Sequence, residues 1–205
     1  MGRHAVSDKW LVSADDPTIT CRAFAERLAK TTNPRHRRML ETVIEHDQAE
    51  GHRDLERTMA TLSATPVYGR FWSCDDLAPV GYAEVREYYG ILFAHGGIGN
   101  LRTEMKTLVV DDDTIVCELV ATAIWPWRQV QELGCGGEEG PGHYALHRPL
   151  VTVIPFDDEL KIRGESSYGG AYFWERVPDD ELSPGYLAWA DRFHSDAAAA
   201  HRYAP

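Results

Sequence analysis

The first half of the chain places apolar residues at helical spacing. Residues 21–30 show this pattern, and residues 35–51 repeat it with Met39, Leu40, Val43 and Ile44 on one face. Asp54 then precedes apolar positions three to four residues apart, which predicts a short helix capped by its carboxylate. A further helix is expected over residues 81–94, because Gly96 and Gly97 follow its last apolar position.

After Gly99 the spacing of the apolar residues changes to two. Residues 101–110 and 115–125 flank a DDDT turn and predict a β-hairpin. A third strand is expected at 144–156 and a fourth at 160–172, while PVYGRFW predicts an earlier short strand. A last helix is expected at 185–194. Helices followed by antiparallel strands predict an α+β fold, in which a curved sheet packs over the helices and leaves a ligand cavity.

Charge and composition narrow the possible partners. The 205 residues include 21 Lys and Arg against 32 Asp and Glu, a net charge of −11. Such a balance disfavours binding to nucleic acid or to an anionic membrane surface. Since no segment approaches 18 apolar residues and no secretory leader is visible, we expect a cytoplasmic protein. A small hydrophobic molecule is the expected partner.

Cofactor and metal sites are not indicated by the sequence. No two of the four cysteines have the CxxC spacing of a zinc or redox site. His46, Glu50 and His52 make a poor metal set, because His52 is six residues from His46 and points elsewhere. The glycine-rich loop at 134–142 lacks phosphate-loop spacing. We therefore expect neither a metal nor a cofactor.

Four segments in this order resemble the nuclear transport factor two-like superfamily. They are HDQAEGHRDLERTMATLSATPVY, GYAEVREYY, TIVCELVAT and FDDELKIRGESSYGG, and together they span about residues 35–175. The resemblance implies a cone-shaped α+β fold of the SnoaL-like, polyketide-cyclase type. It also implies three regions: an N-terminal arm with a short helix at 1–34, the SnoaL-like domain at 35–177 and a C-terminal helical extension at 178–205.

Two enzyme families of this superfamily indicate which positions face the pocket. The oxyanion tyrosine, the base and the second oxyanion donor of ketosteroid isomerases correspond to His46, Arg70 and Thr152 here. None of the three keeps the isomerase residue, so the isomerase reaction itself is disfavoured. Tyr68-Gly69-Arg70 is similar to the start of the epoxide-hydrolase motif, but the later Asp-Arg-Asp set is missing.

The resemblance and the alternation of strand residues together give a candidate site. We expect His46, Arg70 and Glu118 to be catalytic, with His46 as acid or base and Arg70 stabilising an enolate. The expected substrate-binding residues are Tyr68, Trp72, Thr122, Arg148, Thr152, Ser166 and Tyr168. Simpler roles stay open. His46 could be a wall residue, Glu118 could only neutralise Arg70 or Arg148, and the aromatic residues could be core.

The resemblance implies a cofactor-independent enzyme of secondary metabolism, performing acid/base cyclisation or isomerisation of a polyketide-like hydrophobic substrate. A dehydratase, an epoxide-hydrolase-like enzyme and a non-catalytic small-molecule-binding protein are the alternatives. The resemblance also predicts a homodimer formed through the open face of the sheet, with Leu119, Val151 and Val153 as outward contacts.

Overall fold

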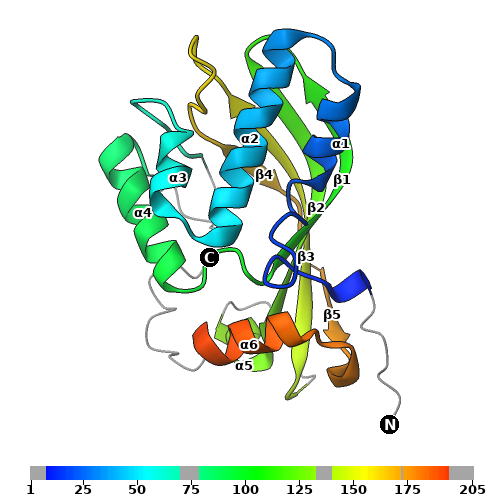
Figure 1. Cartoon of the computed structure of the whole chain (residues 1–205). Coiled ribbons are helices and arrows are strands. Elements are labelled where there is room, and N and C mark those ends of the chain that lie inside the picture. The colour runs from blue at the N-terminus through cyan, green and yellow to red at the C-terminus, as the bar shows by residue number, and fades with distance from the viewer. Residues whose placement is uncertain (1–7, 70–78, 133–139, 172, 194–205) are drawn as a thin grey trace.

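A computed structural model describes residues 8–69, 79–132, 140–171 and 173–193 of the chain (Figure 1). The helices are η1 (Asp8–Trp10), α1 (Arg22–Lys30), α2 (Pro34–His52), α3 (Leu55–Ala60), α4 (Tyr82–Ala94), α5 (Trp127–Glu132), η2 (Asp179–Glu181) and α6 (Pro184–Phe193). The strands are β1 (Leu101–Val110), β2 (Thr114–Pro126), β3 (His143–Pro155), β4 (Ser166–Gly169) and β5 (Phe173–Val177). Within these residues no helix is long and apolar enough to cross a membrane.

The helices begin and end where local chemistry dictates. The Asn33 side chain accepts hydrogen bonds from the first backbone N–H groups of α2, whose first residue is a proline. Arg53 ends this helix in the left-handed conformation, with φ 57°. Asp54 caps α3 through the backbone N–H of Arg57, as its position in the sequence predicted.

The sheet is antiparallel, with β1, β2, β3 and β4 in that order. Of the described residues in the predicted fourth strand at 160–172, Ser166–Gly169 form β4, which pairs with Leu150–Val153 of β3. Strand β5 begins beyond the predicted end of that strand and pairs with His143–His147. In the predicted strand at 66–72, Val67 forms a single bridge with Val80, and residues 70–72 lie outside the described part. Helix α5 was not predicted.

Helices α1 to α4 cover one face of the curved sheet (Figure 1). The main core lies between these two layers and is made of buried apolar residues such as Met39, Val43, Val85 and Ile115. An α+β fold with a curved antiparallel sheet over helices was predicted, and the structure confirms it.

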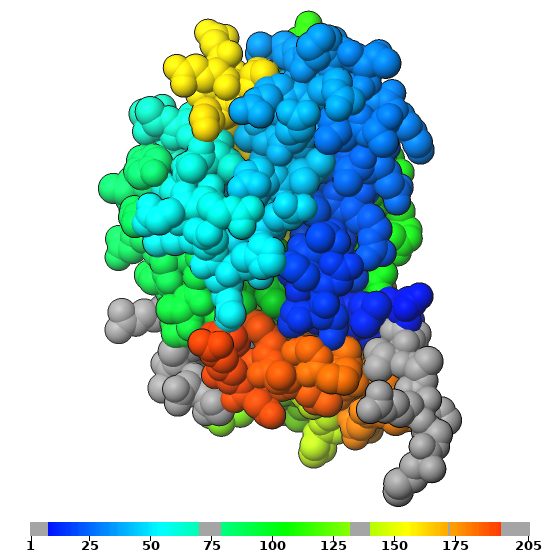
Figure 2. Space-filling model, in the orientation of Figure 1, coloured from blue at the N-terminus to red at the C-terminus, as the bar shows by residue number. Residues whose placement is uncertain are grey.

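A second core covers the other end of the sheet. Trp10 and Val12 from the N-terminal segment pack there with Tyr186 and Trp189 of α6. The Trp10 indole donates a hydrogen bond of 2.8 Å to Glu181. The N-terminal segment and α6 lie against each other on the surface as well (Figure 2). Both ends of the described chain therefore stabilise the same end of the sheet.

Candidate functional site

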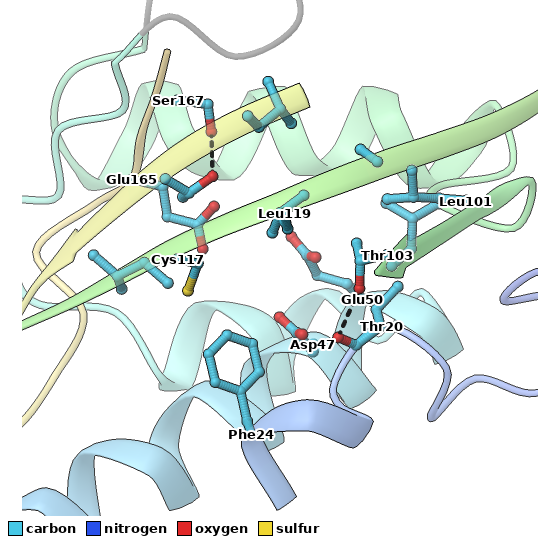
Figure 3. Close-up of a pocket in the computed structure, with 15 residues that line it drawn as sticks. Thr20, Phe24, Asp47, Glu50, Leu101, Thr103, Cys117, Leu119, Glu165 and Ser167 are labelled. Atoms are coloured by element: carbon cyan, nitrogen blue, oxygen red, sulfur yellow. Dashed lines mark hydrogen bonds between the residues drawn. The ribbon is translucent and has the colours of Figure 1, made fainter. Parts of the chain in front are cut away.

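A cavity of about 90 Å³ lies between the helices and the concave face of the sheet. We call it the cone cavity (Figure 3). One part of its wall is apolar, with Phe24, Leu101 and Leu119 among its residues. Its polar wall residues are Thr20, Asp47, Glu50, Thr103, Cys117, Thr152, Glu165 and Ser167.

Three acidic side chains, which we call the carboxyl cluster, face this cavity. Asp47 and Glu50 lie three residues apart on α2, on the same side of the helix as the core residue Val43. Glu165 immediately precedes β4 and approaches from the sheet. Only 14% of the Glu50 side chain and 12% of the Glu165 side chain are exposed. Both carboxylates line the cavity and are otherwise enclosed by protein.

His46 lies behind the carboxyl cluster and is fully buried. Its Nε2 is 3.5 Å from Glu50 Oε1 and 3.7 Å from Glu165 Oε1. Its Nδ1 is 2.7 Å from the Thr61 hydroxyl, which itself donates to the Thr58 carbonyl. Because that hydroxyl proton is already used, His46 Nδ1 carries a hydrogen and donates it to Thr61. Nε2 is left facing the carboxylates.

The charges of this group are strongly coupled. Burial lowers the pKa of His46, but the negative charges of Glu50 and Glu165 outweigh burial and raise it to about 9. Burial raises the pKa of Glu165 to about 7, although the positive charge of His46 opposes the rise. Burial and the charge of Glu50 raise the pKa of Asp47 well above its ordinary value. At neutral pH the cluster thus combines a proton donor with carboxylates that accept protons.

Two tyrosines extend the hydrogen-bond chain away from the cavity. The Tyr89 hydroxyl is 3.0 Å from His46 Nε2 and 2.9 Å from the Tyr68 hydroxyl. Burial raises the pKa of both phenols well above the ordinary value, so both stay neutral. Tyr89 thus holds the imidazole ring of His46, and Tyr68 holds Tyr89.

The structure brings together three of the residues expected from the sequence. Thr152 lines the cone cavity, where its hydroxyl is 2.9 Å from Ser167. His46 lies directly behind the cavity wall, and Tyr68 reaches it through Tyr89. Arg70 and Trp72 fall outside the described residues.

The predicted inward face of β2 was wrong by one residue. Cys117, Leu119 and Ala121 point into the cavity. Glu118 is exposed on the opposite face, where it accepts a hydrogen bond from Thr107. Thr122 also points away from the cavity and bonds to His147 at 2.9 Å. Since successive strand residues alternate between faces, a shift of one residue exchanges the two sets. The same error placed Leu119 among the outward contacts.

The expected positions of Ser166 and Tyr168 were wrong for the same reason. They pair with Val153 and Val151 on the outer face of the sheet, and Tyr168 is 64% exposed. The inward residue between them is Ser167.

Arg148 has the inward parity of Thr152 and lies on β3 between the segment that pairs with β4 and the segment that pairs with β5. Its guanidinium packs against Gly169. A Cβ atom added at Gly169 would lie only 2.2 Å from the Nε atom of Arg148. It is not one of the residues that line the cone cavity.

Sequence reasoning missed Asp47 and Glu165. The signal for Asp47 was present, because it falls four residues after Val43 on the predicted inward face of its helix. Glu165 lies in the GESSY segment, where its contact with a helix residue 119 positions away leaves no local pattern. Among the residues that the structure describes, no three His, Cys, Asp or Glu side chains are placed to hold a metal ion.

No protein-family model and no curated protein sequence matches the chain. Its structural neighbours are nuclear transport factor two-like proteins. One is the Δ5-3-ketosteroid isomerase of a Mycobacterium species, with 15% identity, TM-score 0.47, and coverage of 67% of this chain and 98% of that one. Another is an NTF2-like protein of Anabaena variabilis, with 12% identity, TM-score 0.46, and coverage of 69% and 95%.

The epoxide hydrolase/cyclase-like enzyme SalBIII is a third neighbour, at 15% identity and TM-score 0.44, covering 64% of this chain and 90% of its own length. Likenesses this distant carry nothing about activity, and function has to be argued from the site itself.

Proposed function

We propose that the protein is a cofactor-independent acid/base enzyme that isomerises or cyclises a small, largely hydrophobic molecule. The observation that carries the proposal is the carboxyl cluster: Glu50 and Glu165 face the cone cavity while His46 lies 3.5 and 3.7 Å behind them. A carboxyl group with a pKa near 7 can both take up and release a proton at neutral pH.

In the proposed reaction, Glu165 removes a proton from the carbon next to a substrate carbonyl, and the electron pair moves to the carbonyl oxygen. Asp47, whose pKa is raised well above its ordinary value by burial, stabilises that oxygen in its protonated form by donating a hydrogen bond. For isomerisation, Glu165 returns its proton to another carbon; for cyclisation, the enolate carbon attacks a second carbonyl of the same molecule, whose oxygen takes the proton. His46 is a positioning residue, since its positive charge keeps Glu165 from holding its proton too tightly.

The cavity limits the size of the reacting group. A cavity of roughly 150 Å³ accommodates benzene, and the cone cavity measures about 90 Å³. A polyketide-like substrate would therefore insert one end, with the reacting carbonyl, and leave the remainder outside.

Proton removal can be tested without the natural substrate. We expect the protein to catalyse exchange of carbon-bound hydrogen for deuterium in at least one of three small ketones in D2O, followed by NMR: hydroxyacetone, pyruvate and dimethylaminoacetone. Glu165→Gln should slow this exchange by about 10²-fold, the usual contribution of a positioned base. Glu118→Gln, which changes an exposed glutamate on the outer face, is the matched control and should leave the rate unchanged.

Circular dichroism would establish that each variant is folded. Exchange no faster than in buffer for all three ketones would refute the enzyme proposal. Ligand binding in the same samples would then support a non-catalytic binding protein.

A further inference from the structure

We propose that the cone cavity binds a small alkylammonium group, so that its ligand carries a positively charged nitrogen next to a short apolar chain. The inference deepens the proposed function and rests on it where it names the substrate class. It is carried by the hydrogen-bonding capacity, the charge and the shape of the described cavity wall.

The hydroxyl groups of the wall are mostly occupied by other wall groups. Thr103 donates to the Thr20 carbonyl at 3.1 Å, and the Thr152 and Ser167 hydroxyls bond to each other at 2.9 Å (Figure 3). The three carboxyl groups present six oxygens. These outnumber the wall donors that are left, which are the Thr20 hydroxyl, the Cys117 thiol and one hydroxyl of the Thr152–Ser167 pair. An alkylammonium group supplies three donors and no acceptor. It is therefore complementary to this surplus of acceptors.

The charge of the wall favours the same ligand. No Lys, Arg or His is among the described residues that line the cavity. The imidazolium of His46 lies behind Glu50 and Glu165, with its Nδ1 hydrogen directed at Thr61. With Glu50 and Glu165 ionised and Asp47 protonated, as in the proposed reaction, this group keeps an excess of one negative charge. Buried carboxylates are stabilised by a cation in contact with them and destabilised without one.

Thr20 provides an independent indication that a ligand is accommodated here. Its side chain is only 6% exposed, lines the cavity, and its hydroxyl has no hydrogen-bond partner. Figure 3 shows it next to Asp47 and Glu50, at the acidic end of the cavity. Buried hydroxyl groups are almost always hydrogen-bonded, so this one lacks a partner that a bound molecule would supply.

The apolar part of the wall accepts the carbon chain. This part of the wall includes Phe24, Leu101 and Leu119. The cavity volume of about 90 Å³ suits a branched chain of four carbons better than a ring. The ligand would thus place its nitrogen at the carboxyl cluster and its methyl groups on these side chains.

Binding of a cation must compete with protons. Glu165 faces His46, Asp47 and Glu50 of α2, Tyr68 and Tyr89, and Cys117 of β2. Burial raises the pKa of Asp47 and raises that of Glu165 to about 7, so both carboxyls hold a proton more tightly than an exposed carboxyl does. An ammonium group would replace the proton on Glu165. Its affinity should rise as pH increases from 6 to 8, and protons should be released on binding.

Isothermal titration calorimetry with three compounds of one shape tests the inference: isobutylammonium, 2-methylpropan-1-ol and isobutyrate. We expect the ammonium to bind at least about 10-fold more tightly than the alcohol at pH 8, and isobutyrate not to bind. Titrations in two buffers of different ionisation enthalpy should show proton release. Thr20→Val, which keeps the shape of the side chain, should weaken ammonium binding about 10-fold. Thr107→Val on the outer face is the matched control and should not change it.

Two results would overturn the inference: an alcohol that binds as tightly as the ammonium, or an ammonium that does not bind at pH 8. If the protein catalyses deuterium exchange on hydroxyacetone but does not bind the ammonium, the inference is refuted and the proposed function is retained. Ammonium binding without exchange on any ketone would uphold the binding site and remove the enzyme.

Discussion

Burial of His46 beside two carboxylates should make the stability of the protein depend on pH in an unusual direction. The pKa of this imidazole rises from its ordinary value of 6.5 to about 9 in the folded state. One pKa unit corresponds to about 1.4 kcal/mol, so protonation of His46 contributes about 3 kcal/mol. Because the folded pKa is the higher one, this contribution is complete below pH 6.5 and is lost as pH rises through 9.

Urea unfolding followed by tryptophan fluorescence at pH 6.5, 7.5, 8.5 and 9.5, at constant ionic strength, measures this loss. His46→Gln removes this contribution, so the variant should be less stable than wild type at pH 6.5 and should approach wild type at pH 9.5. His36→Gln removes a histidine of the same helix whose partner Asp112 is 80% exposed, and should retain the wild-type pH dependence. Burial raises the pKa of Cys21 to about 11, so its thiol does not ionise in this range. A wild-type free energy of unfolding that is constant or rises with pH would refute the reasoning.

Three further predictions concern a helix cap, a glycine with a positive φ and the outer face of the sheet. Asp54→Ala removes the cap of α3 and should lower the free energy of unfolding by about 1 kcal/mol, measured by urea denaturation. Gly164→Ala should cost about 3 kcal/mol or more in the same assay, because φ is 135° and the new Cβ would lie 1.7 Å from the Val67 carbonyl oxygen. We also propose that the outer sheet face forms a homodimer; Val151→Asp should then dissociate it in light scattering, and a wild-type mass of only 23.1 kDa at micromolar concentration would speak against this.

Helices α1 to α4 and α6 could be predicted from the sequence because each carries its own signals. The inward face of α2 repeats apolar residues every three to four positions, and Asn33 and Asp54 occupy the cap positions of their helices. The hairpin of β1 and β2 could be predicted for a similar reason, since its turn and both of its strands are adjacent in sequence.

The inward face of β2 could not be read in the same way. Val116 and Val120 alternate with Cys117 and Leu119, so both faces of the strand carry apolar residues and periodicity alone does not choose between them. The site depends on that choice. It also depends on Glu165, which reaches His46 only after the whole sheet has formed, and such a contact has no signature in local sequence.

The second core cannot form until nearly the whole chain has been synthesised. Trp10 contacts Glu181 across 171 positions, and the Ser183 hydroxyl donates to Asp15 across 168. At ~5–20 residues per second, a ribosome needs on the order of ten seconds to make the chain between these partners. Throughout that interval Val12 has no α6 to cover it, and Ile124 has none from the time it is made. The nascent chain therefore presents an apolar surface to chaperones until α6 emerges from the ribosome.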